Sequence, residues 1–141
     1  MNIVDSLEDF DYRLKLGNTL IAGPTGSGKT WLFARLLKNW HYYADSPEIG
    51  LLVICYKVWQ PIYREIISSL PEGTQVKLFS SFPSELGTAE FYDIVPEGKC
   101  SVVLVDDAHS TLASKRAEET LTSLICVLSH HRSVWTFFIV Q

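Results

Sequence analysis

The sequence has little of what a membrane-spanning, secreted or disulfide-bonded protein needs. No uninterrupted apolar run reaches 18 residues, so no transmembrane helix is expected. Residues 1–10 are acidic and lack the basic segment followed by an apolar one that marks a secretory signal. The three cysteines have no zinc or redox spacing, which predicts free thiols in a reducing compartment: Cys55, Cys100 and Cys126. We therefore expect an intracellular protein without a membrane partner.

An excess of positive charge is also missing. The 141 residues carry a formal net charge of −4, and 47% of them are apolar. The apolar content suffices for the core of one domain, so residues 1–141 are predicted to form a single domain. The charge balance argues against a domain that binds nucleic acid over its whole surface. Contact with DNA would need a local basic patch or an assembled ring.

What the sequence does contain is a phosphate-binding loop. Residues 23–30 read Gly-Pro-Thr-Gly-Ser-Gly-Lys-Thr, which matches Gly, four residues, then Gly-Lys and Ser or Thr. An apolar run precedes the loop and a helix-like segment follows it, in the strand, loop, helix order that such a loop requires. We expect these residues to bind ATP through its phosphates: Gly23, Pro24, Thr25, Gly26, Ser27, Gly28, Lys29 and Thr30. No Asn-Lys-x-Asp guanine-reading motif is present, which favours ATP over GTP.

The residue types in this loop fit phosphate chemistry. Glycines permit backbone angles that side chains forbid, and they let main-chain N–H groups approach the phosphates. The helix that follows directs its positive end at the same anion. Lys29 is predicted to be catalytic by reaching the β- and γ-phosphates, and Thr30 to place its hydroxyl on Mg²⁺.

Strand-like and helix-like runs alternate along the chain. Apolar runs predict strands at residues 18–22, 51–55, 76–79, 101–105 and 134–140, after an extended lead-in at 10–16. Helices are predicted at 29–41, 61–70 and 113–129, and a loop that leaves room for one short helix at 80–99. This alternation predicts a three-layer α/β/α fold with a mainly parallel sheet. Two strand-like runs lie between the phosphate-loop strand and the strand at 101–105, and a helix and a strand follow it, an order that suits the RecA-like (ASCE) form of the P-loop NTPases. Because the sequence stops at the end of a strand, we expect further strands beyond the C-terminus of a truncated domain.

A second motif supplies two acids. Residues 102–105 are an apolar run that Asp106 and Asp107 follow directly. Asp106 is predicted to hold Mg²⁺ through water beside Thr30, and Asp107 to orient or deprotonate the attacking water as a catalytic residue. Gln141 follows the last predicted strand, where it is either a catalytic sensor of the γ-phosphate or a solvated strand end.

Together these motifs resemble those of viral genome-packaging ATPases of the FtsK–HerA superfamily. The closest likeness is to the poxvirus type, which virophages and Polinton transposons also encode. The pieces that carry it are residues 23–30, 103–107, 128–132 and 136–141, with 56–63 in addition. The resemblance gives Asp107 the place of the usual catalytic glutamate and Gln141 the sensor place.

The resemblance implies a function and a set of partners. ATP hydrolysis would drive double-stranded DNA through a homo-oligomeric ring, a hexamer, into a capsid. The partners would be double-stranded DNA and capsid proteins, and the location the host cytoplasm, a virus factory or the virion.

One arginine is a candidate for catalysis between subunits. Arg132 follows the helix predicted at 113–129 and would reach a neighbouring subunit's γ-phosphate as an arginine finger. Its rivals for this role are Arg35, Arg64 and Arg116. A cation that stabilises the carboxyl end of a helix is the simpler interpretation.

Two other functions and one structural expectation complete the sequence analysis. A small-molecule kinase would suit the loop, although residues 80–99 contain no arginine for a lid. An assembly switch that binds ATP with little turnover also stays open. The four tryptophans are predicted to lie in the core rather than to stack on bases: Trp31, Trp40, Trp59 and Trp135.

Overall fold

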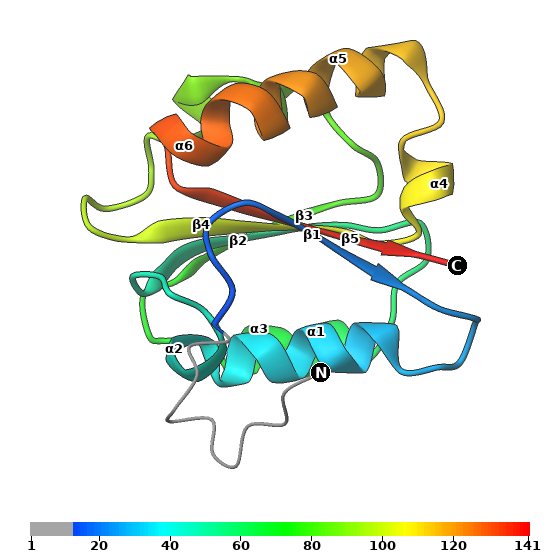
Figure 1. Ribbon diagram of the computed structural model, residues 1–141, viewed down its shortest axis with the longest axis horizontal. Helices are drawn as coiled ribbons and strands as arrows, with labels where there is room; N and C mark the ends of the chain where they lie inside the picture. Colours follow the sequence, from blue (N-terminus) through cyan, green and yellow to red (C-terminus); the bar gives the residue numbers. More distant parts are fainter. Residues whose placement is uncertain (1–12) are drawn as a thin grey trace, which may run out of the picture.

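A five-stranded parallel sheet is the middle layer of the computed structural model, which describes residues 13–141 (Figure 1). Its strands are β1 (Asn18–Ala22), β2 (Ile49–Cys55), β3 (Gln75–Phe79), β4 (Cys100–Val105) and β5 (Val134–Val140). Their order across the sheet is β1-β5-β4-β2-β3, and every neighbouring pair is parallel. β2 and β4 are buried along their whole length, as expected of strands covered on both faces.

Helices cover both faces of this sheet (Figure 1). One face carries α1 (Lys29–Lys38), α2 (Trp40–Tyr43) and α3 (Ile62–Ser68). The other carries α4 (Ala108–Thr111), α5 (Lys115–Ser123) and α6 (Ser129–His131), with a π-helical turn at Leu124–Leu128. The predicted three-layer α/β fold is confirmed. None of the helices within residues 13–141 has the length and apolar character needed to span a bilayer.

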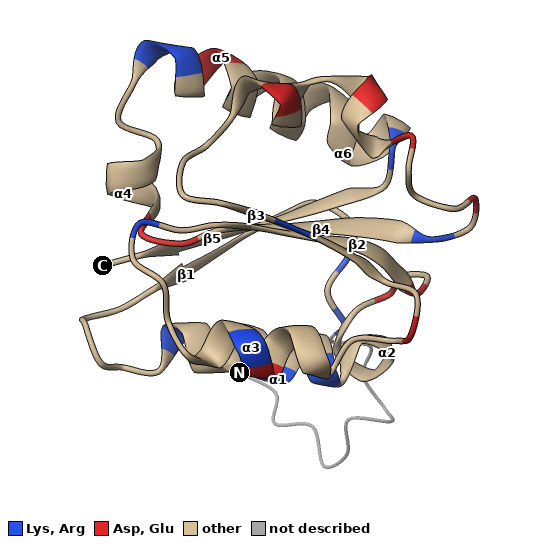
Figure 2. Cartoon of the chain, turned by 180° about the vertical axis from the view of Figure 1, so that it is seen from behind, with Lys and Arg blue, Asp and Glu red and all other residues tan. Residues whose placement is uncertain are grey.

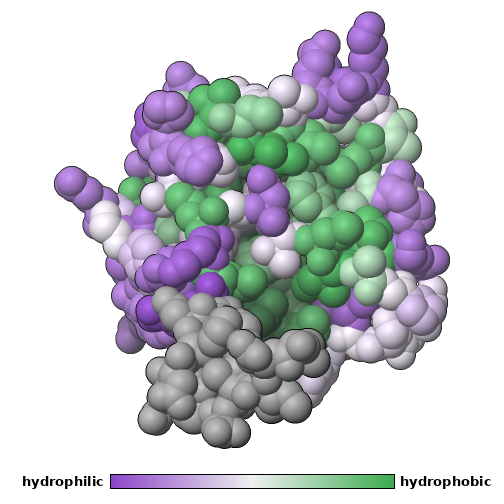
Figure 3. Space-filling view, viewed as in Figure 1, coloured by the Kyte–Doolittle hydropathy of each residue, from purple (hydrophilic) through white to green (hydrophobic). Residues whose placement is uncertain are grey.

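Within residues 13–141, β1 forms one lateral edge of the sheet. β1 is the last strand on its side of the sheet, and its Leu20 side chain is 64% exposed. Hydrophobic residues are exposed on the face that includes this edge (Figure 3). Within residues 13–141 only β5 pairs with β1, and a strand edge without a partner presents backbone donors and acceptors to which a further strand can pair.

Aromatic side chains join α1 and α2 to the sheet. The rings of Trp40 and Trp135 meet edge to face with centroids 4.9 Å apart, and those of Phe33 and Phe137 with centroids 5.2 Å apart. All four side chains are buried. Edge-to-face pairs of this kind stabilise a core beyond the area that they bury.

Replacing Trp135 by alanine is expected to destabilise the domain by about 3–5 kcal/mol, the usual result of removing a fully buried large aromatic side chain. Trp135 is 1% exposed, whereas Trp31 is 57% exposed, so Trp31→Ala is a matched control. The control should change stability by no more than about 0.5 kcal/mol. Urea denaturation measures both variants, and equal losses would contradict the central place of Trp135 in the core.

The helix predicted for residues 29–41 is divided in two. α1 ends at Lys38, and Asn39 leaves the helical region with φ −119° and ψ 42° before α2 begins at Trp40. The side-chain amide of Asn39 donates to the carbonyl oxygen of Arg35 at 3.2 Å. Such local side-chain bonds compete with helical pairing. Apolar periodicity could not show this break because the spacing continues through Trp40.

The helix predicted for residues 113–129 also differs from the structure. Ser114 caps α5 by accepting a backbone N–H three residues further on, at 3.1 Å, so α5 begins at Lys115. A short α4 precedes it, which the sequence did not predict because four residues are too few to show a helical period.

The predicted lead-in and the predicted loop are more irregular than the strands. Within the lead-in at 10–16, Leu14 forms only an isolated parallel bridge with Ala44, and residues 10–12 lie outside the described part of the chain. The segment at 80–99 contains two 3₁₀ turns, Ser84–Gly87 and Ala89–Tyr92.

The prediction of four core tryptophans was half right. Trp40 and Trp135 are buried, but Trp31 is 57% and Trp59 37% exposed. The reason is position: Trp31 lies on the outer side of the first turn of α1, and Trp59 lies in the loop between β2 and α3. Trp31 and Trp59 therefore both lie near the carboxyl ends of the parallel strands.

Candidate functional site

The segments that carry the predicted site residues, except Arg132, meet at one edge of the sheet, the one formed by the carboxyl ends of the strands. The strands are parallel, so the residues that follow β1, β4 and β5 leave the sheet at the same end. β5 lies between β1 and β4. A crevice outside the carboxyl ends of parallel strands is where α/β proteins bind ligands.

A cavity of about 700 Å³ lies at this edge. Of the predicted site residues it is lined by Thr25, Gly26, Gly28, Lys29, Thr30, Asp106, Asp107 and Gln141. Its other lining residues are Trp31, Lys57, Val58, Gln60, Pro61, Ile62, Tyr63, Ile139 and Val140. Gly23, Pro24 and Ser27 belong to the same loop but do not line the cavity. Arg132 lies elsewhere.

The loop after β1 has the backbone conformation that its glycines predict. Gly26 and Gly28 have φ values of 80° and 88°, and a Cβ atom on either would meet no other atom within 4 Å. The left-handed backbone, rather than lack of space, therefore requires glycine at these two positions. Lys29 Nζ donates to the carbonyl oxygens of Gly23 at 2.7 Å and Pro24 at 2.8 Å. Its ammonium group is thus held over the start of the loop.

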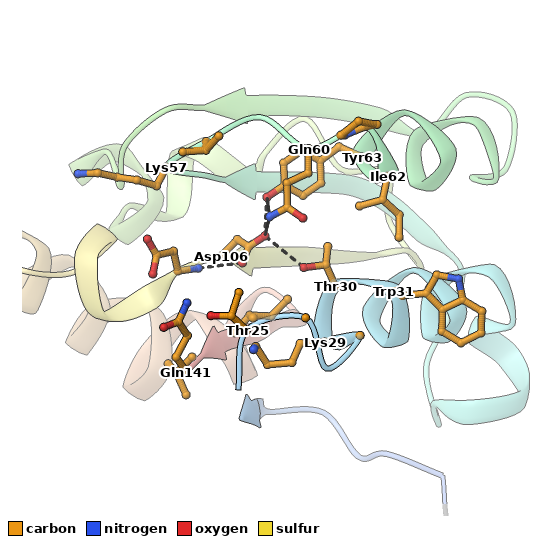
Figure 4. A pocket seen from close by; sticks show the side chains of 17 residues that line it. Thr25, Lys29, Thr30, Trp31, Lys57, Gln60, Ile62, Tyr63, Asp106 and Gln141 are labelled. Carbon is orange, nitrogen blue, oxygen red and sulfur yellow. Dashed lines mark hydrogen bonds between the residues drawn. The ribbon is translucent and has the colours of Figure 1, made fainter. Parts of the chain in front are cut away.

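Asp106 is the most buried charged group at this edge, with 5% of its surface exposed. Its Oδ2 atom accepts hydrogen bonds from Thr30 Oγ1 at 3.5 Å, Gln60 Nε2 at 3.1 Å and the Tyr63 hydroxyl (Figure 4). Its Oδ1 atom accepts from the backbone N–H of Asp107 at 2.8 Å. The fold therefore brings together Thr30 and Asp106, which are 76 positions apart.

These two side chains suit a magnesium ion. Mg²⁺ prefers oxygen ligands and is held by one or two protein groups together with phosphates and water. Thr30 and Asp106 supply a hydroxyl and a carboxylate side by side. Residues 13–141 contain no cluster of three His, Cys, Asp or Glu side chains that would form a complete protein cage. The donor set thus fits an ion shared with a phosphate ligand.

Asp107 has an unusual backbone. Its φ and ψ are both 51°, which is the left-handed region, and it directly precedes α4. Its Oδ1 atom lies 3.1 Å from His109 Nε2. Non-glycine residues in this conformation are often found at functional sites, and aspartate and asparagine tolerate it best. Asp107 therefore presents a half-buried carboxylate to the cavity from a sharply turned backbone.

The cavity has two distinct ends. Lys57 and Gln141 lie at one end and Trp31 at the other, with Thr30 and Asp106 between them (Figure 4). Gln141 directly follows β5, and β5 is hydrogen-bonded to the phosphate-binding loop. The N–H of Gly23 donates to the carbonyl oxygen of Val140, the last residue of β5, at 3.3 Å.

Sequence reasoning missed Gln60, Tyr63 and Lys57. The available signal was position, since all three follow β2, the strand next to β4 in the sheet. Strand order is not visible in the sequence, so this proximity to Asp106 was not foreseen. Burial, together with the hydrogen bond to Asp106, raises the pKa of the Tyr63 hydroxyl, which therefore stays protonated and donates.

Arg132 lies at the opposite end of the sheet from the cavity. It comes just before Val134, the first residue of β5, whereas Gln141 follows the last. Its guanidinium pairs with Asp93 at 2.7 Å, and 42% of its side chain is exposed. Arg132 therefore does not reach the cavity of its own chain. Its rival Arg35 packs against the Trp31 ring, 5.6 Å from the centroid.

Comparison with known proteins gives a family match and a likeness to several solved structures. The family described as "AAA domain" matches residues 14–141. No curated protein matches the chain. ATPases 2 and 3 of EccC from Thermomonospora curvata, solved with a signal sequence peptide, superpose with a TM-score of 0.56 at 16% identity. The cytoplasmic domain of the Type VII secretion ATPase EccC from the same organism gives 0.58 at 17%. Each likeness covers 88% of this chain but only 25% and 16% of those chains.

Proposed function

Because this chain belongs to the AAA domain family of P-loop ATPases, we propose that it binds and hydrolyses ATP at the cavity described above. We propose further that it is the motor domain of a ring that moves double-stranded DNA during packaging of a viral or transposon genome. One observation carries the ATP site: the loop after β1 and the acid after β4 converge, with Thr30 Oγ1 3.5 Å from Asp106 Oδ2.

Different residues around the cavity have different roles in ATP hydrolysis. Backbone N–H groups of the loop and the amino end of α1 bind the phosphates, and Lys29 adds a positive charge. Thr30 and Asp106 would hold Mg²⁺, which would supply positive charge to the phosphates. Asp107 orients the attacking water and takes its proton, and Gln141 contacts the γ-phosphate from the end of β5.

The charge distribution supports contact with DNA through an assembly rather than through one chain. Lys and Arg residues occur in both helical layers, mixed with Asp and Glu along the chain (Figure 2). With a net charge of −4, the chain as a whole is not basic enough to bind DNA over its entire surface. A ring would gather basic groups from several copies around one channel. Arg132, exposed at the far end of β5, would act on the cavity of a neighbouring copy.

The packaging function rests on the motif combination and not on the related folds. EccC is a secretion ATPase, and at 16–17% identity it shares the fold alone. The motifs that favour packaging are the two acids after β4, His130-His131-Arg132 before β5 and Gln141 after it. In this function the chain acts in the host cytoplasm, a virus factory or the virion, with capsid proteins as partners.

The proposal is tested by measuring ATP hydrolysis of the purified chain with and without duplex DNA, alongside its oligomeric mass by light scattering. We expect a homo-oligomer whose turnover rises when DNA is added. A monomer that ignores DNA but transfers phosphate to a small acceptor would be a kinase instead. Tight ATP binding with almost no turnover under either condition would indicate an assembly switch.

A further inference from the structure

Two side chains that donate hydrogen bonds to Asp106 have no role in the hydrolysis mechanism proposed above. Gln60 and Tyr63 both donate to Asp106 Oδ2, the same oxygen that Thr30 contacts. We propose that Gln60 and Tyr63 are positioning residues that fix the Asp106 carboxylate for Mg²⁺ and thereby set the affinity of the site for that ion. This inference rests on the proposed function, because it concerns the same cavity.

The hydroxyl of Tyr63 is held in one place by its surroundings. The side chain is fully buried, and its ring packs against those of Tyr56 and Trp59 with centroids 5.9 Å and 5.2 Å away. Gln60 Nε2 lies 3.4 Å from the Tyr63 hydroxyl as well as 3.1 Å from Asp106 Oδ2. The two donors therefore form one connected group that approaches Asp106 from the β2 side of the cavity (Figure 4).

A buried carboxylate needs such partners. Removing an aspartate from water is unfavourable unless hydrogen bonds replace the lost solvent, and Asp106 is 5% exposed. The backbone of Asp107 satisfies Oδ1, so the orientation of the carboxylate depends on what holds Oδ2. Thr30 makes the longest of the three bonds to Oδ2 and is itself a predicted ligand of the ion. Gln60 and Tyr63 are thus the contacts that persist when Thr30 turns to Mg²⁺.

The arrangement has a known physical consequence. Outer groups that bond to a metal ligand fix its direction, and their loss typically weakens metal binding by about 10–100-fold. A carboxylate that is already oriented loses less freedom when the ion binds. The inference therefore predicts a change in metal dependence, whereas a purely structural role of Tyr63 would change stability alone.

The test is Tyr63→Phe, which removes one hydroxyl and keeps the ring that packs with its neighbours. Binding of a fluorescent, non-hydrolysable ATP analogue is measured as a function of Mg²⁺ concentration and again in EDTA. We expect the Mg²⁺ concentration at half-saturation to rise about tenfold or more, and binding in EDTA to stay unchanged. Gln60→Leu, which removes the other donor from the loop after β2, should shift the curve in the same direction.

Tyr92→Phe is the matched control. Tyr92 is also buried and donates its hydroxyl, to the carbonyl oxygen of Leu86 at 2.7 Å, in the cluster on the other face of the sheet. It should alter urea stability and leave the Mg²⁺ curve in place. If Tyr63→Phe fails to fold, Gln60→Leu alone decides the matter, because Gln60 is only half-buried.

The outcomes separate the inference from the proposed function. A wild-type chain that binds no nucleotide would contradict the proposed function. A wild-type chain that binds nucleotide, with the same Mg²⁺ curve in Tyr63→Phe or Gln60→Leu as in Tyr92→Phe, would overturn the inference alone. A lower Mg²⁺ requirement in either variant would overturn it too, since Gln60 and Tyr63 would then be withholding Asp106 from the ion.

Discussion

Lys29→Ala is expected to abolish nucleotide binding and, with it, hydrolysis. The ammonium of Lys29 is the positively charged side chain of the loop, and it is held at the loop's start by Gly23 and Pro24. Each charge-assisted hydrogen bond to a phosphate oxygen contributes about 1.5–3 kcal/mol. Loss of two such bonds weakens ATP binding by about 100-fold or more. Titration calorimetry with a non-hydrolysable ATP analogue measures this effect.

Lys38→Ala is the control for this change. Lys38 ends the same helix, is exposed and lies outside the cavity, so its removal alters the net charge equally without touching the phosphates. We expect wild-type affinity in this variant. Near-equal affinity in the two variants would show that the loop does not bind phosphate through Lys29.

Asp107→Asn is expected to preserve ATP binding and to stop turnover. An amide cannot take the proton of the attacking water, and the loss of a general base typically slows a reaction by about 10²–10⁴-fold. Asparagine tolerates the left-handed backbone of residue 107 as well as aspartate does, so the turn into α4 should persist. Single-turnover hydrolysis and nucleotide affinity are measured separately.

The control for Asp107→Asn is Glu72→Gln. Glu72 is an exposed acid outside the cavity, so its change removes the same charge and should leave turnover unaltered. Normal hydrolysis by Asp107→Asn would remove Asp107 from the role of water activator. Asp107 would then serve only to form the left-handed turn into α4.

Local sequence determined the elements and the loop. The phosphate-binding pattern at residues 23–30 depends on adjacent residues, as do the left-handed angles that Gly26 and Gly28 adopt. Strands β1 and β5 match their predicted bounds, because each contains a short apolar run that ends at a turn or polar residue. The alternation of strand and helix was enough to predict three layers and a parallel sheet.

The tertiary structure alone decided what surrounds the acids. Strand order is a matter of pairing between distant segments, and nothing in the spacing along the chain shows that β2 lies beside β4. Because β2 lies beside β4, Gln60 and Tyr63 can donate hydrogen bonds to Asp106. The direction of β5 likewise puts Arg132 at the far end of the sheet from Gln141. Local patterns report which residues form an element, whereas long-range packing selects which elements meet and thus which side chains share the cavity.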